Sequence, residues 1–380
     1  MVAYLDHAAS TPLRPTALDA MAAHLRDRYA NPSGAHRAAR AERRAIDEVR
    51  DTLAELTGAD PGEVVFTSGG TEADNLAVFG VHDRVGGVVV ASAVEHHAVL
   101  EPASTRGARI VGVHSTGLVD LDALAEVLDP DVRLVTVMLV NNEVGTVQPL
   151  AEVAVVVRQH APAAVLHTDA VQAPTWLDVA CVATDADLIS VSAHKFGGPK
   201  GVGALVVRGG VDISARQVGG GQERERRSGT QNVAGIVAMG VAAREAIDER
   251  AAVVARVGTL RERLVTGLRD RVPGLIETGT VAGAPPPARV PGICHVCIPG
   301  VESESLLYLL EREDVFASAA ASCASGAMEA SHVLAAMGVD DRAAHGSLRL
   351  SLGWSSTDAD VDAALAVVPA AVERLRTFAA

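Results

Sequence analysis

Short apolar runs rich in β-branched residues recur between about residues 60 and 210, and polar or helix-forming segments separate them. Runs of this length are typical of strands that are buried on both faces of a parallel sheet. Their alternation with helices predicts βαβ units in a large α/β domain. The pattern predicts strands over 64–66, 87–92, 108–113, 133–140, 164–168, 187–192 and 203–207.

The pattern changes after residue 233. An amphipathic stretch over 234–271 predicts a long helix that links two domains, and the Pro-rich stretch 283–292 predicts a loop. Two further apolar runs, 293–298 and 348–353, predict strands, and 358–376 predicts a terminal helix. We therefore expect an α/β protein with a mostly parallel central sheet flanked by helices in a large domain over 13–250. Residues 1–12 and 251–380 would form a smaller α+β domain.

Composition narrows the functional classes. The 33 basic and 47 acidic residues give a net charge of −14, which argues against direct binding of nucleic acid or of an anionic membrane. No apolar stretch reaches the ~18 residues of a membrane span, and the first residues do not resemble a signal peptide. Four cysteines are too few for a secreted disulfide framework. We expect a cytoplasmic protein.

Lysine is nearly absent from the chain. Of the 33 basic residues only two are lysines, Lys195 and Lys200, and both lie in the segment SAHKFGGPKGVG. Arginine can replace lysine as a surface charge, but it cannot attack a carbonyl as a free primary amine does. The two lysines are therefore either candidates for covalent chemistry or remaining surface and anion-binding groups.

In open α/β sheets, ligands bind beyond the carboxyl ends of the strands. Polar residues follow several of the predicted strands at these ends. The residues that follow three consecutive predicted strands are Asn142, Asp169 with Gln172, and Lys195. Taken singly, they could be an Asx-turn, a helix N-cap and a solvated loop charge. Together they match the needs of pyridoxal 5'-phosphate, which requires a lysine for its aldehyde and a carboxylate for its ring nitrogen.

A Gly-Gly-Thr turn follows the strand predicted over 64–66. Gly70 and Thr71 open a predicted helix whose free backbone N–H groups could bind a phosphate. Taken alone, Thr71 is more readily explained as a helix N-cap. The P-loop pattern is absent from the sequence.

The chain resembles a known family in ten segments that occur in order and at matching spacing. The segments are YLDHAAST, NPSGAHRAAR, FTSGGTEADNLA, VEHHAVLE, VNNEVGTVQP, HTDAVQA, SAHKFGGPKGVGAL, QERERRSGT, SCASGAMEASHVL and RLSLG. They are similar to those of NifS/IscS-type cysteine desulfurases, which are fold-type I, class V aminotransferase-like enzymes dependent on pyridoxal phosphate. The resemblance extends from about residue 3 to residue 354.

The resemblance implies a role for each matching residue that would bind the cofactor. Lys195 would bond to its aldehyde and shuttle protons, Asp169 would pair with its ring nitrogen, and His96 would stack on the ring and act as an acid/base group. Gln172 and Asn142 would contact its phenolic oxygen and hold substrate. The phosphate would be bound by Gly70, Thr71, Ser192 and His194, helped by Thr230 of the other protomer in a homodimer.

The resemblance also implies two residues that act on substrate. Arg349 would bind the α-carboxylate of L-cysteine with its planar fork, although in an alternating strand it could equally make a structural ion pair. Cys323 would be the nucleophile, and the small residues around it predict a loop. By itself a cysteine in an Ala-rich segment is more often a small buried residue. Cys294 and Cys297 lie in an apolar run and are expected to pack in the core, so we predict no metal site.

The chain departs from the family pattern around the nucleophile. It has Ala319, Ala320 and Ala321 where relatives carry more glycine, Ala330 where proline is common, and Glu225 where a small residue is frequent. None of these changes removes a reacting group. The short S-C-x-S-G loop is similar to the group I branch.

The expected activity is desulfuration of L-cysteine to L-alanine with a persulfide on Cys323. The sulfur would pass to an acceptor protein, either an iron–sulfur scaffold or a tRNA thiolation enzyme. Two alternatives remain open on the same scaffold: a selenocysteine lyase or other class V aminotransferase-type reaction, and an inactive sulfur-transfer scaffold.

Overall fold

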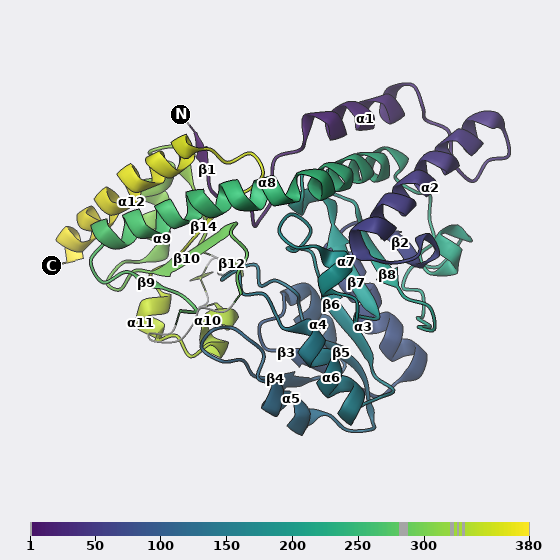
Figure 1. Ribbon diagram of the computed structural model, residues 1–380, viewed down its shortest axis with the longest axis horizontal. Coiled ribbons are helices and arrows are strands. Elements are labelled where there is room, and N and C mark those ends of the chain that lie inside the picture. Colours follow the sequence, from purple (N-terminus) through teal and green to yellow (C-terminus); the bar gives the residue numbers. More distant parts are fainter. Residues whose placement is uncertain (1, 281–287, 320–322, 325–326, 329–330, 380) are drawn as a thin grey trace.

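A seven-stranded sheet forms the centre of the molecule (Figure 1). The computed structural model describes residues 2–280, 288–319, 323–324, 327–328 and 331–379. The sheet order is β2-β8-β7-β6-β5-β3-β4, and β8 is antiparallel to both of its neighbours while the other pairs are parallel. Its strands are β2 (Val64–Thr67), β3 (Val88–Ser92), β4 (Arg109–Val111), β5 (Val132–Thr136), β6 (Val165–Asp169), β7 (Leu188–Ser192) and β8 (Gly203–Val207).

All of these strands were predicted, but β5 is shorter than expected. The apolar run continues to residue 140, whereas the strand ends at Thr136. Beyond it the chain still hydrogen-bonds alongside β6, since the N–H groups of Val137 and Leu139 donate to the carbonyls of His167 and Asp169 at 3.1 and 2.9 Å. The apolar run over 133–140 therefore reflects burial of the whole segment, although only its first part is a strand.

Helices cover both faces of this sheet (Figure 1). In β2, Val64 and Phe66 pack into one apolar core and Val65 into another, because successive side chains of a strand point to opposite faces. The helices that precede residue 233 are α1 (Pro15–Arg26), α2 (Arg37–Thr57), α3 (Gly70–Val85), α4 (His97–Ser104), α5 (Leu121–Val127), α6 (Leu150–His160) and α7 (Val179–Val182). Three 3-10 turns occupy Pro61–Glu63, Ala193–Lys195 and Gln222–Glu225.

The predicted long helix is α8 (Val233–Arg271), drawn in green across Figure 1. Its first half packs into the core under the large sheet, and residues from Val253 onward pack into a second core. Because α8 passes through both cores without a break, we keep the domain boundary near residue 250 as a proposal.

The second core lies around a three-stranded antiparallel sheet with the order β14-β10-β9. As predicted, Cys294 and Cys297 are buried in β10. Beside this sheet, β1 pairs with β11 in parallel. The elements are β1 (Ala3–Tyr4), β9 (Ile276–Glu277), β10 (Ile293–Cys297), β11 (Val315–Phe316), β14 (Ser347–Ser351), α9 (Ser303–Glu311), α10 (His332–Ala336), α11 (Asp341–Ala344) and α12 (Asp358–Ala379).

The segment predicted as a loop around the nucleophile contains a small hairpin. Strand β12 (Cys323–Ala324) pairs antiparallel with β13 (Ala327–Met328). Ala320, Ala321, Ala330 and the first half of the predicted 283–292 loop lie outside the described residues.

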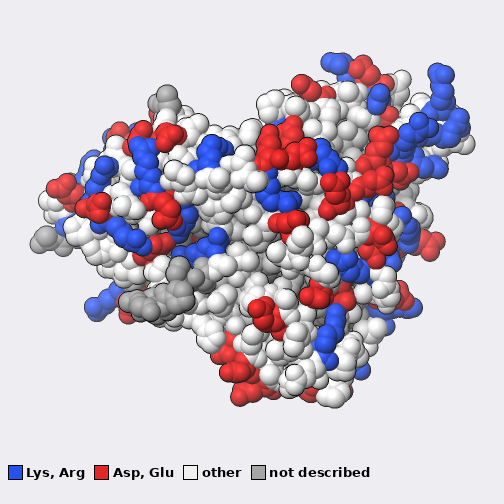
Figure 2. Space-filling view, viewed as in Figure 1, with Lys and Arg blue, Asp and Glu red and all other residues white. Residues whose placement is uncertain are grey.

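The surface carries charges of both signs. Figure 2 shows acidic and basic side chains interspersed over one face of the molecule, in keeping with the modest negative net charge of −14. Across the described part of the chain, none of the helices is both long enough and apolar enough to cross a membrane.

Candidate active site

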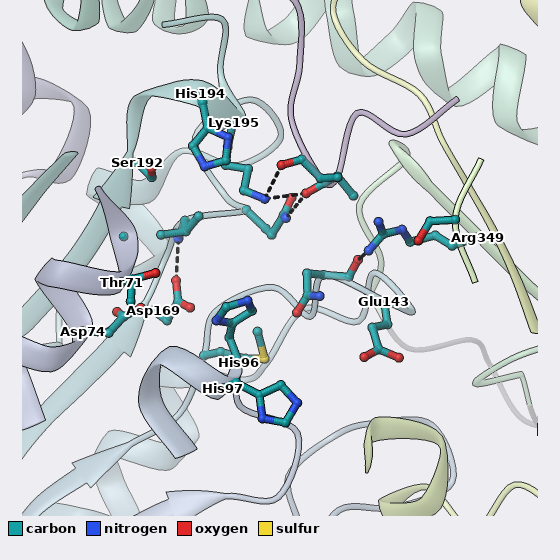
Figure 3. A pocket seen from close by; sticks show the side chains of 18 of the residues that line it. Thr71, Asp74, His96, His97, Glu143, Asp169, Ser192, His194, Lys195 and Arg349 are labelled. Atoms are coloured by element: carbon teal, nitrogen blue, oxygen red, sulfur yellow. Dashed lines mark hydrogen bonds between the residues drawn. The ribbon is translucent and has the colours of Figure 1, made fainter. Parts of the chain in front are cut away.

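A cavity of about 420 Å³ opens at the carboxyl ends of the central strands. Parallel strands direct these ends toward one edge of the sheet, so residues far apart in sequence meet there. Figure 3 shows the labelled side chains around the cavity, with Lys195 and Arg349 entering from different sides. The predicted site residues that line it are Gly70, Thr71, His96, Asn142, Asp169, Gln172, Ser192, His194, Lys195 and Arg349.

Lys195 ends the 3-10 turn that follows β7 directly. Its ammonium group donates hydrogen bonds to the backbone carbonyls of Ala8 and Ala9 at 2.6 and 2.9 Å. Burial, and secondarily the nearby Arg349 guanidinium, lower the pKa of Lys195 to about 8. A buried cationic amine gives up its proton more easily, so a usable fraction of Lys195 is a nucleophile near neutral pH.

Asp169 is the last residue of β6 and lies buried at the base of the cavity. One carboxylate oxygen accepts a hydrogen bond from the Val171 backbone N–H at 2.8 Å. Burial raises the pKa of Asp169, because the buried carboxylate loses its hydration. A cationic partner beside Asp169 would stabilise the ionised form. Gln172, one turn further, donates its side-chain amide to the Ala8 carbonyl at 2.8 Å.

His96 caps the N-terminus of α4. Its Nδ1 atom accepts a hydrogen bond from the backbone N–H of Ala98 at 3.0 Å. Burial lowers the pKa of His96, so the ring is neutral at neutral pH. The helix cap fixes the orientation of the ring, and the ring lines the cavity close to Asp169 (Figure 3).

The start of α3 and the end of β7 form a cradle suited to an anion. Helix α3 begins at Gly70, where its first backbone N–H groups have no partner within the helix. A Cβ atom on Gly70 would lie only 2.8 Å from Val171 Cγ2, so a side chain does not fit there without displacement. Ser192 Oγ is buried and has no hydrogen-bond partner among the residues that the structure describes. An unpartnered buried hydroxyl beside free N–H groups fits a phosphate.

Two further predicted phosphate ligands, Thr71 and His194, take less buried positions. Thr71 is exposed at the first turn of α3. His194 Nδ1 lies 3.3 Å from Ser10 Oγ, and burial lowers the pKa of His194 to about 4. His194 therefore contributes a neutral ring rather than a positive charge.

Arg349 lies in the middle of β14 and is buried. It donates through Nη1 to the Asn142 carbonyl and through Nη2 to a carboxylate oxygen of Asp6, both at 2.8 Å. Its Nε atom is buried and has no partner in the described part of the chain. The structural ion pair expected as the alternative for Arg349 thus exists, and a further donor remains unused beside the cavity.

The structure places Thr230 outside the cavity lining and does not describe the side chain of Cys323. Thr230 is exposed just before α8 and is not among the lining residues. The Cys323 backbone belongs to β12, but its side chain lies outside what the structure describes. Both assignments remain predictions.

Sequence reasoning missed several residues of the cavity wall, among them Asp74, Glu143 and His332. Asp74 lies one helical turn after Gly70, so helical spacing could have indicated it. Glu143 accepts a hydrogen bond from Ser331, and burial raises the pKa of Glu143 to about 7. No sequence signal places Ser331 beside Glu143, because the two are distant along the chain.

The sequence matches the class-V aminotransferase family over residues 3–364. It is 44% identical to an IscS-like cysteine desulfurase of Mycobacterium tuberculosis, an alignment that spans 100% of this chain and 98% of the relative. The chain belongs to the NifS/IscS-like cysteine desulfurases. A second relative, cysteine desulfurase IscS of Dictyoglomus turgidum, is 40% identical over 99% of this chain and 95% of its own length.

Two solved structures superpose on most of the chain. A NifS-like protein has a TM-score of 0.90 at 34% identity, with 98% of this chain and 100% of that chain covered. The complex of SspA with cysteine has a TM-score of 0.79 at 29% identity, over 93% of this chain and 99% of that chain. The predicted fold class, a class V aminotransferase fold with a mostly parallel central sheet, is confirmed.

Proposed function

We propose that this chain is a pyridoxal 5'-phosphate-dependent L-cysteine desulfurase. It converts L-cysteine to L-alanine and leaves the sulfur atom on Cys323 as a persulfide. The observation that carries the proposal is the convergence of Lys195, Asp169 and the unpartnered Ser192 hydroxyl on one cavity. Lys195 and Lys200 are the only lysines in the chain, and Lys195 alone of the two lines the cavity.

The residues present fit the cofactor. Lys195 would hold its aldehyde, Asp169 its ring nitrogen, and the start of α3 with Ser192 its phosphate. When bound, pyridoxal 5'-phosphate supplies an electron sink that acidifies the α-carbon of an amino acid. The orphaned Ser192 hydroxyl supports this assignment independently of family membership, since a native protein seldom buries such a group without use.

The chain's own residues would handle substrate and protons. Arg349 would bind the substrate carboxylate through donors beside the cavity, and the Lys195 amine, once free, would move a proton at the α-carbon. His96 would carry a proton to or from a sulfur atom. The Cys323 thiolate would form a bond to the substrate sulfur as the carbon–sulfur bond breaks, its electron pair remaining with the carbon fragment that becomes L-alanine after protonation.

The proposal extends to partners. A homodimer would place Thr230 of one protomer at the phosphate site of its partner, which would account for an exposed threonine predicted to bind the cofactor. The persulfide would pass to an acceptor protein of iron–sulfur assembly or tRNA thiolation. We further propose a cytoplasmic location, because the described cysteines are unpaired and a reactive thiol requires a reducing compartment.

The test compares three variants of the purified, cofactor-loaded protein supplied with L-cysteine. Cys323→Ala should keep the visible absorbance of the bound cofactor and lose alanine formation. Lys195→Ala should lose the absorbance itself. Cys181→Ala is the matched control, because Cys181 is an exposed cysteine that does not line the cavity. It should behave as the wild type, with persulfide found by mass spectrometry on Cys323 alone.

Alanine formation by Cys323→Ala would contradict the assigned nucleophile. Turnover of selenocysteine with no turnover of L-cysteine would favour a selenocysteine lyase. If the purified protein bound no pyridoxal 5'-phosphate, the only remaining alternative would be an inactive sulfur-transfer scaffold.

A further inference from the structure

The N-terminal segment contacts both cations of the cavity. The Asp6 carboxylate accepts a hydrogen bond from Arg349 Nη2 at 2.8 Å. Two and three residues later, the carbonyls of Ala8 and Ala9 accept from Lys195 at 2.6 and 2.9 Å. One short stretch of chain thus supplies acceptors both for the lysine that would hold the cofactor and for the arginine that would bind the carboxylate of an amino acid.

The backbone of this segment is held firmly against β14. The N–H of Ser351 donates to the Leu5 carbonyl at 2.7 Å, and Ser351 Oγ accepts from the Ala8 N–H at 2.9 Å. The Tyr4 hydroxyl donates to the carbonyls of Asp6 and Ser10 at 3.1 and 2.7 Å. Asp6 therefore has a fixed Cα beside Arg349, and what remains free to move is its side chain.

The two partners of the ion pair differ in burial. The Arg349 side chain is 6% exposed, whereas that of Asp6 is 23% exposed. Within the described part of the chain, Arg349 hydrogen-bonds through both of its Nη atoms, and its Nε donor is unused. The arginine is thus the fixed member, and the carboxylate is the member with room to turn toward solvent.

We propose that Asp6 is a displaceable counter-ion, which holds Arg349 in position between turnovers and competes with the α-carboxylate of the amino acid for the same guanidinium. The inference rests on the proposed function, because it assumes that Arg349 receives that carboxylate. Asp6 is a positioning residue and contacts no reacting atom.

We expect this competition to help the enzyme exchange its product, L-alanine, for its substrate, L-cysteine. Substrate and product carry the same α-carboxylate, so an arginine with no competing anion would retain L-alanine as strongly as it captures L-cysteine. A carboxylate already paired with the guanidinium weakens the binding of both by repulsion between like charges. It also keeps the buried arginine paired while the site is empty, when an unpaired buried charge would be costly.

The first test uses Asp6→Asn in the cofactor-loaded enzyme. The amide oxygen of asparagine can still accept from Nη2, so the substitution removes charge and preserves shape. We expect the KM for L-cysteine and the inhibition constant of L-alanine to fall together, by about 3- to 10-fold, the size of effect expected for one neighbouring like charge. The inhibition constant of 2-aminoethanethiol, which has no carboxylate, should stay unchanged.

Combining Asp6→Asn with Arg349→Gln tests whether the effect depends on the interaction between Asp6 and Arg349. In the Arg349→Gln background, Asp6→Asn should lower both constants by less than in the wild type, because only the direct repulsion between the two carboxylates remains once the shared guanidinium is gone. Asp6→Ala, which loses both the charge and the acceptor, should lower kcat as well, since Arg349 would no longer be held in position.

A second readout needs neither cofactor nor turnover. Asp6 is one of the charges that raise the pKa of Lys195, so Asp6→Asn should make the apoprotein amine react with an amine-directed label at lower pH. Lys200, the only other lysine, is an internal reference in the same digest. Its labelling profile should not move.

An unchanged or raised KM in Asp6→Asn, or an equal effect on 2-aminoethanethiol, would overturn the proposal. Failure of the proposed function would show differently, as a wild-type protein that turns over no L-cysteine. In that case the labelling of Lys195 still reports whether Asp6 acts on the cavity.

Discussion

The Nδ1 atom of His96 lies 3.0 Å from the backbone nitrogen of Ala98. A backbone N–H only donates, so Nδ1 must hold a lone pair, and a neutral imidazole then carries its proton on Nε2. Burial lowers the pKa of His96, which keeps the ring neutral at neutral pH. The helix cap therefore selects the tautomer that His96 presents to the other groups of the cavity.

Replacing His96 by Gln should remove the proton carrier and leave the cofactor site in place. We expect alanine formation to fall by at least ~100-fold, the usual contribution of general acid–base catalysis, while the visible absorbance of the loaded enzyme remains. His160→Gln is the control, because His160 is exposed at the end of α6. A His96→Gln variant with near wild-type rates would exclude this role.

The reduced pKa of Lys195, about 8, predicts how capture of pyridoxal 5'-phosphate depends on pH. The capture rate of the apoprotein follows the fraction of free amine, so it should rise by ~10-fold from pH 7 to pH 9 and then level off. An ordinary lysine would keep gaining up to ~pH 10.4. Stopped-flow absorbance measures the rate. Lys200→Arg should give the same curve, and a rise that continues beyond pH 10 would contradict the burial effect.

Ser190 and Ser192 offer a matched pair in β7. Both are buried, but Ser190 Oγ lies 3.0 Å from His167 Nε2, while Ser192 Oγ has no partner. Ser190→Ala should lower the free energy of unfolding of the apoprotein by about 1 kcal/mol, and Ser192→Ala should leave it unchanged or raise it. Ser192→Ala should instead weaken cofactor binding by ~10-fold. Urea unfolding and cofactor titration measure the two effects, and a reversed ranking would argue against the anion cradle.

Burial raises the pKa of Glu143 to about 7, which makes its effect on stability depend on pH. The pKa of an unfolded Glu is ~4.3, so the stabilisation present below pH ~4 is lost as the pH rises through 7. Glu143→Gln cannot ionise and should be more stable than the wild type at pH 8, by up to ~3 kcal/mol, with the difference shrinking toward pH 4.

Urea unfolding at several pH values measures this difference. Glu152→Gln, at an exposed position of α6, should show no such pH dependence. A stability difference for Glu143→Gln that is constant from pH 4 to pH 8 would mean that Glu143 does not titrate as proposed.

Much of the site follows from the order of elements along the chain. Because parallel strands carry the residues after them to one edge, the positions of Asp169 and Lys195 after β6 and β7 were enough to predict that they share a cavity. Strand ends were predicted less well, as β5 shows by stopping at Thr136 within a longer apolar run. Hydrophobicity reports burial, and burial continues past the last paired strand residue.

The sequence by itself determined the α/β alternation, the long helix, the strand-end chemistry and the family, since each depends on local periodicity or on motifs contiguous in the chain. Only the tertiary structure decided that Asp6 binds Arg349 and that Ser331 binds Glu143. Each pair joins residues that lie far apart along the chain. Their contact depends on how β14, the N-terminal segment and α10 pack, and no local pattern encodes that packing.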